Sequence, residues 1–240
     1  MQTFFEKLKL MITDRAMRNR VLFVLGGLLV FRALSTVPVP GMDIMRLEQF
    51  LTNNQLLGFF NIFSGGGLKR LSIVMLGVSP YITASIIMQL MTVMFPGLKA
   101  LYTEEGETGR HKFTQYTRLL SLPLAVLQGF GFLTLLSSQG IIVGLSTFAF
   151  MASLVVIVAG SMLLMWVAEL VTEFGIGNGV SIIIFSGIVA GLPATIGQML
   201  FTFDSTQLPL YLGFLLAALI VVYGIVVMTE AERPVPITHA

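Results

Sequence analysis

The sequence predicts an all-α membrane protein with several transmembrane helices, and two observations carry this prediction. The first is the spacing of charge, because four long stretches of the 240-residue chain contain no Asp, Glu, Lys or Arg. The second is composition, since 55% of the residues are hydrophobic and only 11% are charged. A helix needs about 20 mostly apolar residues to cross the hydrocarbon core of a bilayer. The charge-free stretches are Leu71–Leu98, Leu119–Ala168, Phe174–Phe203 and Ser205–Thr229.

Six spans follow from these stretches. A fifth apolar stretch, Val21–Met42, is interrupted only by Arg32, which we expect to extend toward the outer interface. Leu119–Ala168 is long enough for two helices and breaks at the polar residues Ser137–Gly140. The predicted spans lie at residues 21–38, 72–95, 117–137, 147–168, 179–200 and 208–229.

The distribution of basic residues predicts the orientation of these spans. An even number of spans places both ends of the chain on one side of the membrane. That side would carry ten of the 14 Lys and Arg residues, and the other side only three. Since cytoplasmic loops are rich in Lys and Arg, both termini are expected in the cytoplasm. Residues 1–20 mix apolar and charged side chains, so they form either an interfacial amphipathic helix or a charged tail that only sets the topology.

The connection between the first two spans contains an unusual apolar segment. The first span ends at Val37–Gly41, where two prolines stop the helix. Leu56–Phe63 is apolar but too short to cross a membrane, and Ser64–Arg70, which contains three consecutive glycines, follows it. This segment either re-enters the protein, where other residues or a water-filled cavity surround it, or forms an extramembrane loop with an apolar face.

The second span combines small and polar residues with one aliphatic face. Pro80 lies inside this span and is expected to kink it. Val78, Ile82 and Ile86 recur every four residues, and Val180 and Ile184 repeat that spacing at the start of the fifth span. On spacing alone, ordinary helix packing explains these five residues.

Two polar regions separate later spans. The segment Gly97–Arg118 contains three glutamates, followed by Arg110, His111 and Lys112. This composition is typical of a solvated, mixed-charge cytoplasmic loop. Glu169 and Glu173 end the fourth span, and the turn Gly175–Gly179 leads into the fifth. Glycines give the backbone the freedom that this turn needs.

Several kinds of chemistry lack the residues that they need. The chain has no Cys and only two His, and no Asp or Glu falls inside a predicted span. Coupled transporters typically use acids or histidines within the membrane, and intramembrane proteases need a catalytic dyad or metal ligands there. A phosphate-binding loop is also missing from the sequence, and the net charge of +2 gives no reason to expect direct reading of nucleic acid. We therefore expect neither an enzyme nor a cofactor or metal, which leaves a conduit, a structural subunit or a carrier of neutral solutes.

The local sequences resemble the SecY family, whose members form the centre of the bacterial Sec protein-conducting channel. The resemblance extends over the whole chain, and its motifs occur in the family's order. The matching stretches are Val37–Gly41, Asn61–Gly66, Gly77–Gln89, Glu105–Arg110, Gln115–Arg118, Gly175–Gly179 and Gly187–Pro193.

The resemblance implies a role for each of these regions. The segment at about residues 56–70 would be a plug that closes the channel and swings away on opening. The aliphatic residues would belong to the pore ring, which loses water, blocks ions and deforms around a passing peptide. Polar residues on the second and third spans, and before the fifth, would lie at a lateral gate toward lipid. By resemblance, the pore ring is Val78, Ile82, Ile86, Val180 and Ile184; the plug and its hinge are Leu57, Phe60, Asn61, Phe63, Ser64, Gly65, Gly66 and Gly67; the lateral gate is Thr83, Gln89, Gln128 and Asn178; and the basic partner-binding positions are Arg110, Lys112 and Arg118.

The resemblance also implies partners, a location and an organisation. The partners would be the SecE and SecG subunits, the SecA motor ATPase or a ribosome, signal peptides, nascent chains and membrane lipid. The location would be the cytoplasmic (inner) membrane. Residues 1–20 would form a cytoplasmic amphipathic segment, 21–200 the N-terminal half of the channel, and 201–240 a sixth span with the start of a cytoplasmic loop.

The sequence departs from the family pattern in three respects. Family members have about twice as many spans, arranged as two inverted halves, so this chain would supply half of a pore ring and half of a gate. Pro234–Ile237 stands where a basic run is usual, and Phe174 stands where the family commonly has Arg. The sequence expectation is therefore a channel subunit for translocating secretory proteins and inserting membrane proteins. A transporter of a neutral solute and a non-conducting fragment that only binds partners are the alternatives.

Overall fold

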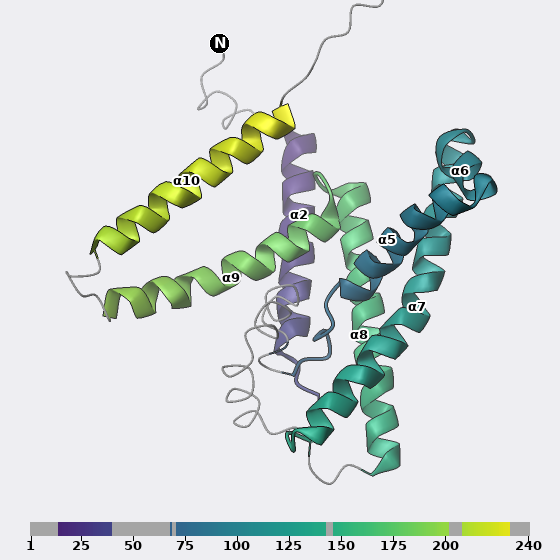
Figure 1. The fold of residues 1–240 in the computed structure, drawn as a ribbon, viewed down its shortest axis with the longest axis horizontal. Coiled ribbons are helices and arrows are strands. Elements are labelled where there is room, and N and C mark those ends of the chain that lie inside the picture. Colours follow the sequence, from purple (N-terminus) through teal and green to yellow (C-terminus); the bar gives the residue numbers. More distant parts are fainter. Residues whose placement is uncertain (1–13, 40–67, 69–70, 143–145, 202–207, 231–240) are drawn as a thin grey trace, which may run out of the picture. The chain divides into compact units, whose positions relative to one another are not determined.

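The computed structural model describes residues 14–39, 68, 71–142, 146–201 and 208–230. All the regular elements in these ranges are α-helices (Figure 1), which confirms the predicted fold class. The chain divides into two compact units, Met1–Leu192 and Pro193–Ala240. The helices are α2 (Arg15–Thr36), α5 (Ser79–Met94), α6 (Pro96–Thr103), α7 (Gly106–Ser138), α8 (Thr147–Phe174), α9 (Gly179–Phe201) and α10 (Leu208–Glu230).

The first helix starts earlier than the predicted span at residue 21. Asp14 caps α2, because its carboxylate accepts a hydrogen bond from the backbone N–H of Ala16 at 3.1 Å. The last residues of the proposed N-terminal segment, 15–20, therefore continue directly into the first span. The helix ends at Thr36, immediately before Val37 and Pro38, as the two prolines predict.

The second span was predicted to begin at residue 72, and this boundary is wrong. Residues 71–78, which we call the connector, form a series of turns, and α5 begins only at Ser79. Positive φ angles at Leu71 (46°) and Gly77 (58°) are incompatible with a regular helix. The connector instead pairs with residues 37–39, which follow α2, and the N–H of Val39 donates to the Leu71 carbonyl at 2.8 Å.

Pro80 does not kink the second span, contrary to the prediction. It occupies the first turn of α5, where backbone N–H groups have no partner within the helix and a proline is tolerated. The sharp break comes at the other end of this helix, where α5 and α6 meet at an angle of 113°. Phe95 there is extended, with φ −115° and ψ 108°, as expected for a residue before a proline.

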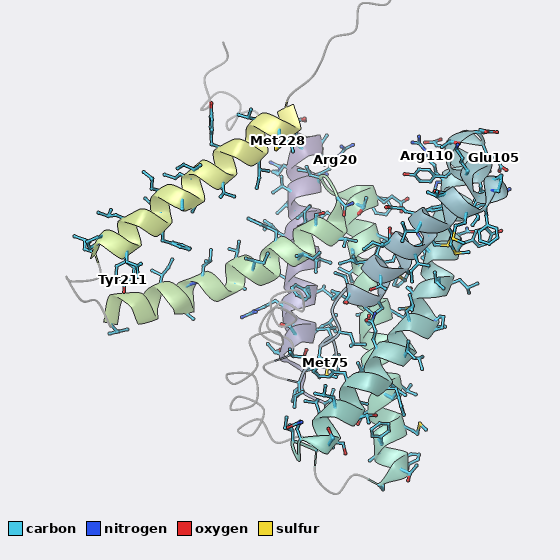
Figure 2. All side chains as sticks on the ribbon, viewed as in Figure 1. Arg20, Met75, Glu105, Arg110, Tyr211 and Met228 are labelled. Atoms are coloured by element: carbon cyan, nitrogen blue, oxygen red, sulfur yellow. The ribbon has the colours of Figure 1, made fainter. Side chains whose placement is uncertain are left out.

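The mixed-charge region predicted as a loop is largely helical. α6 runs from Pro96 to Thr103, and α7 begins at Gly106, so residues 97–118 form a helical hairpin. α6 packs against the start of α7, where the rings of Tyr102 and Phe113 lie 4.9 Å apart. Figure 2 shows Glu105 and Arg110 at this end of α7. With 33 residues, α7 is about 50 Å long, which exceeds the hydrocarbon thickness of about 30 Å.

α7 is the central helix of the first unit, because it packs against α5, α6 and α8. Its buried positions recur every four residues and so form one stripe along the helix. Much of the helix outside the stripe is exposed, including large apolar side chains such as Leu119 and Leu127. The stripe consists of Gly109, Phe113, Thr117, Ser121, Ala125, Gly129 and Leu133.

α8 begins at the predicted residue and packs against both α7 and α2. Ser146 caps it, since its hydroxyl accepts a hydrogen bond from the N–H of Ala149 at 3.2 Å. One main core lies between the connector, α7 and α8, with Leu71, Met75, Leu133 and Ile157 among its buried residues. Figure 2 labels Met75 on the connector.

α10 forms most of the described part of the second unit. It is apolar along its whole length and exposes large hydrophobic side chains on all sides. Within the described part of the chain, four helices, α2, α7, α8 and α10, are individually long and apolar enough to cross a membrane, and the bent pair α5–α6 raises the number to five. The described apolar part of α9, Gly179–Ala194, is shorter. The chain is thus a multi-pass membrane protein, and the count of six spans stays a prediction.

Candidate functional site: an aliphatic cluster beside an open cavity

The five aliphatic residues predicted to share one function lie at the starts of α5 and α9, with Val78 as the residue directly before α5. Val78 is buried in a hydrophobic cluster with Phe31 of α2 and Ile183 of α9. Ile82, Val180 and Ile184 are partly buried and pack against the same cluster. We call Val78, Ile82, Ile86, Val180 and Ile184 together the aliphatic cluster. The structure therefore brings together residues that are about 100 positions apart in the sequence.

Val78, at the end of the connector, caps α5, and Ile82 and Ile86 of α5 follow it on one face. The N–H of Ile82 donates to the carbonyl of Val78 at 3.0 Å, so the helical register is already set at Val78. Residues four apart lie above one another on a helix. Exposure rises along this face from Val78, which is 1% exposed, to Ile86, which is 52% exposed. The aliphatic face thus runs from the buried core of the protein into open space.

A tight turn between α8 and α9 places Val180 and Ile184 next to α5. Gly177 has φ 71°, a conformation that favours glycine. Gly179 approaches α8 so closely that an added Cβ would collide with the Ala168 carbonyl, and its N–H donates to Thr172 Oγ1 at 2.8 Å. Asn178 caps α9, because its side chain accepts a hydrogen bond from the N–H of Ser181 at 3.1 Å.

An open cavity of about 670 Å³ lies beside the aliphatic cluster, between α5, α7, α8 and α9. Ile82, Ile86, Val180 and Ile184 line one part of it. The remainder of the wall is polar and includes His111, Arg118, Glu169 and Glu173. The wall of the cavity therefore combines an aliphatic part with a charged part, and we call the charged part the charged rim.

An ion pair between α7 and α8 forms part of the charged rim. Arg118 Nε contacts Glu169 Oε1, and the Glu169 side chain is only 15% exposed. Glu173 lies one turn further along α8, where the like charge of Glu169 is unfavourable. Arg118 therefore compensates an acidic end of α8 that would otherwise face the cavity unpaired. The two partners are 51 residues apart, and sequence spacing gave no indication of this pair.

The predicted lateral-gate residues are only partly brought together. Gln128 of α7 donates from Nε2 to Thr83 Oγ1 of α5 at 3.4 Å, so these two residues do join the second and third spans. Asn178 lies instead at the cap of α9, on the wall of the cavity. Gln89 is exposed near the end of α5.

The remaining predicted positions fall outside the cavity or outside the described residues. Lys112 forms an exposed ion pair with Glu105 at 3.7 Å, and Arg110 is exposed on the same part of α7. Phe174 packs against Phe23 of α2 with 5.6 Å between ring centroids. The predicted plug and hinge, Leu57–Gly67, lie outside the described residues. No group of three His, Asp or Glu residues that could bind a metal occurs within the described ranges.

Sequence reasoning missed the contacts that hold the connector. Ser161 of α8 donates a hydrogen bond to the Gly77 carbonyl at 2.9 Å, across 84 residues. The neighbouring residue, Gly160, lies directly against the Ile73 carbonyl. The only sequence signal was a pair of small residues in an apolar span, which is common at helix interfaces in membranes.

Comparisons with known proteins agree on one family. The family model described as SecY matches residues 72–240. The protein translocase subunit SecY of Vibrio cholerae is 44% identical over 231 residues, which cover 93% of this chain and 52% of that protein. The subunit of the same name from Escherichia coli is 41% identical over 232 residues, with the same coverage of 93% and 52%. The chain therefore spans about half the length of these relatives.

Two solved structures share the fold at low sequence identity. One is described as the structure of a protein-conducting channel, with a TM-score of 0.61 and 18% identity, covering 92% of this chain and 52% of that one. The other is Sec61 in the canine ribosome–channel complex from the endoplasmic reticulum, with a TM-score of 0.62 and 17% identity, covering 99% and 55%. At this identity the likeness concerns the arrangement of the helices.

Proposed function

The chain belongs to the SecY family, and we propose that it forms part of the wall of a channel that moves unfolded proteins across a membrane. Its aliphatic cluster would be one side of the pore constriction, and the cavity beside it would be the path toward that constriction. The remaining side of the constriction would come from a part of the channel that this chain does not contain. The relatives are named as translocase subunits, and this role needs no catalytic residue.

One observation supports this proposal above the others. The four cavity-lining members of the aliphatic cluster come from two helices and share one cavity with a set of charged residues. An aliphatic constriction excludes water and ions when closed, yet it forms no specific bond that would hold a passing peptide.

The same site gives a lateral exit toward lipid in our proposal. The hydrogen bond between Gln128 and Thr83 joins α7 to α5 at 3.4 Å. We infer that α5 and α7 together form this chain's half of the gate, which opens toward lipid to admit a signal peptide or a membrane-spanning segment. Gln89 and Asn178 would flank the opening, and Leu57–Gly67 would plug the closed channel.

The setting completes the proposal. The membrane would be the cytoplasmic one, with both termini in the cytoplasm, as the distribution of basic residues predicts. The chain would be organised as the sequence suggested, with a cytoplasmic amphipathic segment at 1–20, the N-terminal half of the channel at 21–200, and a sixth span with the start of a cytoplasmic loop at 201–240. SecE, SecG and either SecA or a ribosome would be the partners, and one structural neighbour was solved in a ribosome–channel complex. Arg110 and Lys112, which are exposed on α7, are suitable for contacting such a cytoplasmic partner.

A crosslinking experiment tests the proposal, and it uses the absence of Cys in this chain. A chimeric channel is made in which the chain replaces the matching part of the Escherichia coli relative, with all other cysteines removed. Ile82→Cys is introduced, and a secretory protein with one Cys is stalled during export. We expect a disulfide between the two cysteines that depends on the signal sequence.

The control and the contrary results are equally specific. Val155→Cys on α8, where the native side chain is 66% exposed, should give no crosslink. An inserted chimera that yields no crosslink from Ile82→Cys would contradict the conduit. Saturable uptake of a small solute would then favour a transporter, and stable insertion with neither activity would favour a fragment that only binds partners.

A further inference from the structure

Two consecutive residues of α8 hold the connector at its backbone. Gly160 lies against the carbonyl of Ile73, so closely that an added Cβ would overlap both the carbonyl oxygen and its carbon. Ser161 donates a hydrogen bond to the carbonyl of Gly77 at 2.9 Å, and both of these polar groups are buried. One helix thus fixes the connector at two points, one by shape and one by a hydrogen bond.

The connector needs such support because it cannot stabilise itself as a helix does. Its internal hydrogen bonds are short turns, such as Gly77 N–H to Val74 O at 2.8 Å and Met75 N–H to Ser72 O at 2.9 Å. Pro80 has no N–H, so it cannot reach back to the last carbonyls of the connector. A buried carbonyl without a donor costs free energy, and the Ser161 hydroxyl supplies the donor for Gly77.

The position of Val78 depends directly on this contact. Val78 follows Gly77 and is the most buried member of the aliphatic cluster, at 1% exposure. The first helical hydrogen bond of α5 ends on its carbonyl. A contact that fixes Gly77 therefore also fixes the position and direction of the first turn of α5, where the aliphatic face begins. α8 is well suited to hold the connector in place, because it packs against both α2 and α7.

We propose that Gly160 and Ser161 are positioning residues for the channel constriction, which set how tightly Val78 and Ile82 close the resting pore. This inference rests on the proposed function, because it assigns the aliphatic cluster to the constriction. Neither residue would touch a translocating chain. Their substitution changes the closed channel more than it changes transport through the open one.

The test measures ion leak through the resting chimeric channel in proteoliposomes, together with export of a secretory protein. Ser161→Ala removes the donor, and we expect the leak to rise by about fivefold, the factor that one net hydrogen bond gives in a two-state equilibrium. Gly160→Ala places a methyl group against the Ile73 carbonyl and should raise the leak at least as much. Ser161→Thr keeps the donor and should leak less than Ser161→Ala.

Matched controls separate this role from general loosening of the bundle. Ser153 is also buried on α8, but its hydroxyl bonds to Ala149 O of the same helix at 2.9 Å. Gly131 of α7 has open space where a Cβ would be added. Ser153→Ala and Gly131→Ala should both leak as little as the unsubstituted chimera, at equal amounts of inserted protein.

The outcomes distinguish this inference from the proposed function. Wild-type leak in inserted Ser161→Ala and Gly160→Ala channels overturns the inference, and so does an equal rise in Ser153→Ala. If Gly160→Ala fails to insert, the comparison of Ser161→Ala with Ser161→Thr decides alone. Failure of the unsubstituted chimera to export protein, together with no crosslink from Ile82→Cys, overturns the proposed function and removes the basis of the inference.

Discussion

Small residues determine how closely the helices of the first unit approach one another. An added Cβ at Gly27 of α2 would lie 2.6 Å from Val171 Cγ2 of α8, and one at Gly129 of α7 would lie 3.0 Å from Leu154 Cδ1 of α8. In lipid, helices gain little from the hydrophobic effect and associate through close packing instead. Glycines that look unfavourable for a helix in water are therefore the positions that join α2 and α7 to α8.

One buried serine makes no such contribution. Ser72 of the connector is fully buried, and its hydroxyl finds no hydrogen-bond partner within the described part of the chain. A buried polar group that is left unpaired costs about 1–3 kcal/mol. We expect Ser72→Ala to leave the chimeric channel as stable as before, or to raise its melting temperature in detergent.

Ser161→Ala is the matched comparison for this prediction. Ser161 is as deeply buried as Ser72, but its hydroxyl has a partner, the Gly77 carbonyl. Removing it leaves that carbonyl unpaired, so the melting temperature should fall by an amount that corresponds to about 1 kcal/mol or more. An equal fall for Ser72→Ala would show that the Ser72 hydroxyl has a partner outside the described residues.

At the scale of the element, apolar composition predicted which segments form helices better than it predicted where they begin. α8 starts at Thr147, the residue predicted from the polar break inside the charge-free stretch Leu119–Ala168. α5 starts at Ser79 rather than at residue 72, because contacts with Val37 and Val39 hold the connector in turns. Those contacts link residues more than 30 positions apart, and no local pattern shows them.

Some features of the candidate site follow from the local sequence, and others depend on contacts between residues that are far apart in the sequence. Four-residue spacing correctly placed Val78, Ile82 and Ile86 on one helical face, because helical periodicity is a local property. It could not show that Val180 and Ile184 pack against the same cluster. That placement depends on the tight turn before α9, where Gly179 contacts Ala168. Only the resemblance to a family joined the two sets before the structure did.

The ion pair between α7 and α8 gives a prediction at this scale. Arg118 and Glu169 are partly exposed, with 43% and 15% of their side chains accessible, so their coupling should be modest, about 1 kcal/mol or less. A double-mutant cycle with Arg118→Gln and Glu169→Gln, read from unfolding of the chimera in detergent, measures it. The coupling should be smaller in high salt.

A substitution at Glu173 and the size of the coupling energy both show how much the charges contribute to holding α7 and α8 together. Glu173→Gln should stabilise α8 slightly, since it removes a like charge one turn from Glu169. A coupling energy of zero between Arg118 and Glu169 at low salt would mean that the two helices are held by packing alone. The stripe of buried residues on α7, from Gly109 to Leu133, would then account for the whole interface.

At the scale of the whole molecule, the predicted orientation in the membrane rests on charge and on the length of α7. α7 begins at Gly106 and ends at Ser138, and it is long enough for its two ends to lie on opposite sides of the bilayer. The positive-inside rule predicts that the basic end, with Arg110, Lys112 and Arg118, lies in the cytoplasm. The opposite end, near Gln139, would face outward.

Cysteine accessibility tests this orientation directly. Glu104→Cys and Gln139→Cys replace exposed residues at the two ends of α7, in a chimera without other cysteines. A membrane-impermeant maleimide should label Gln139→Cys in intact cells and Glu104→Cys only after the membrane is opened. Labelling in the reverse order would invert the orientation and place the charged rim of the cavity outside the cell. A motor or ribosome in the cytoplasm could not then deliver a chain to that rim, so the same result would contradict the proposed direction of transport.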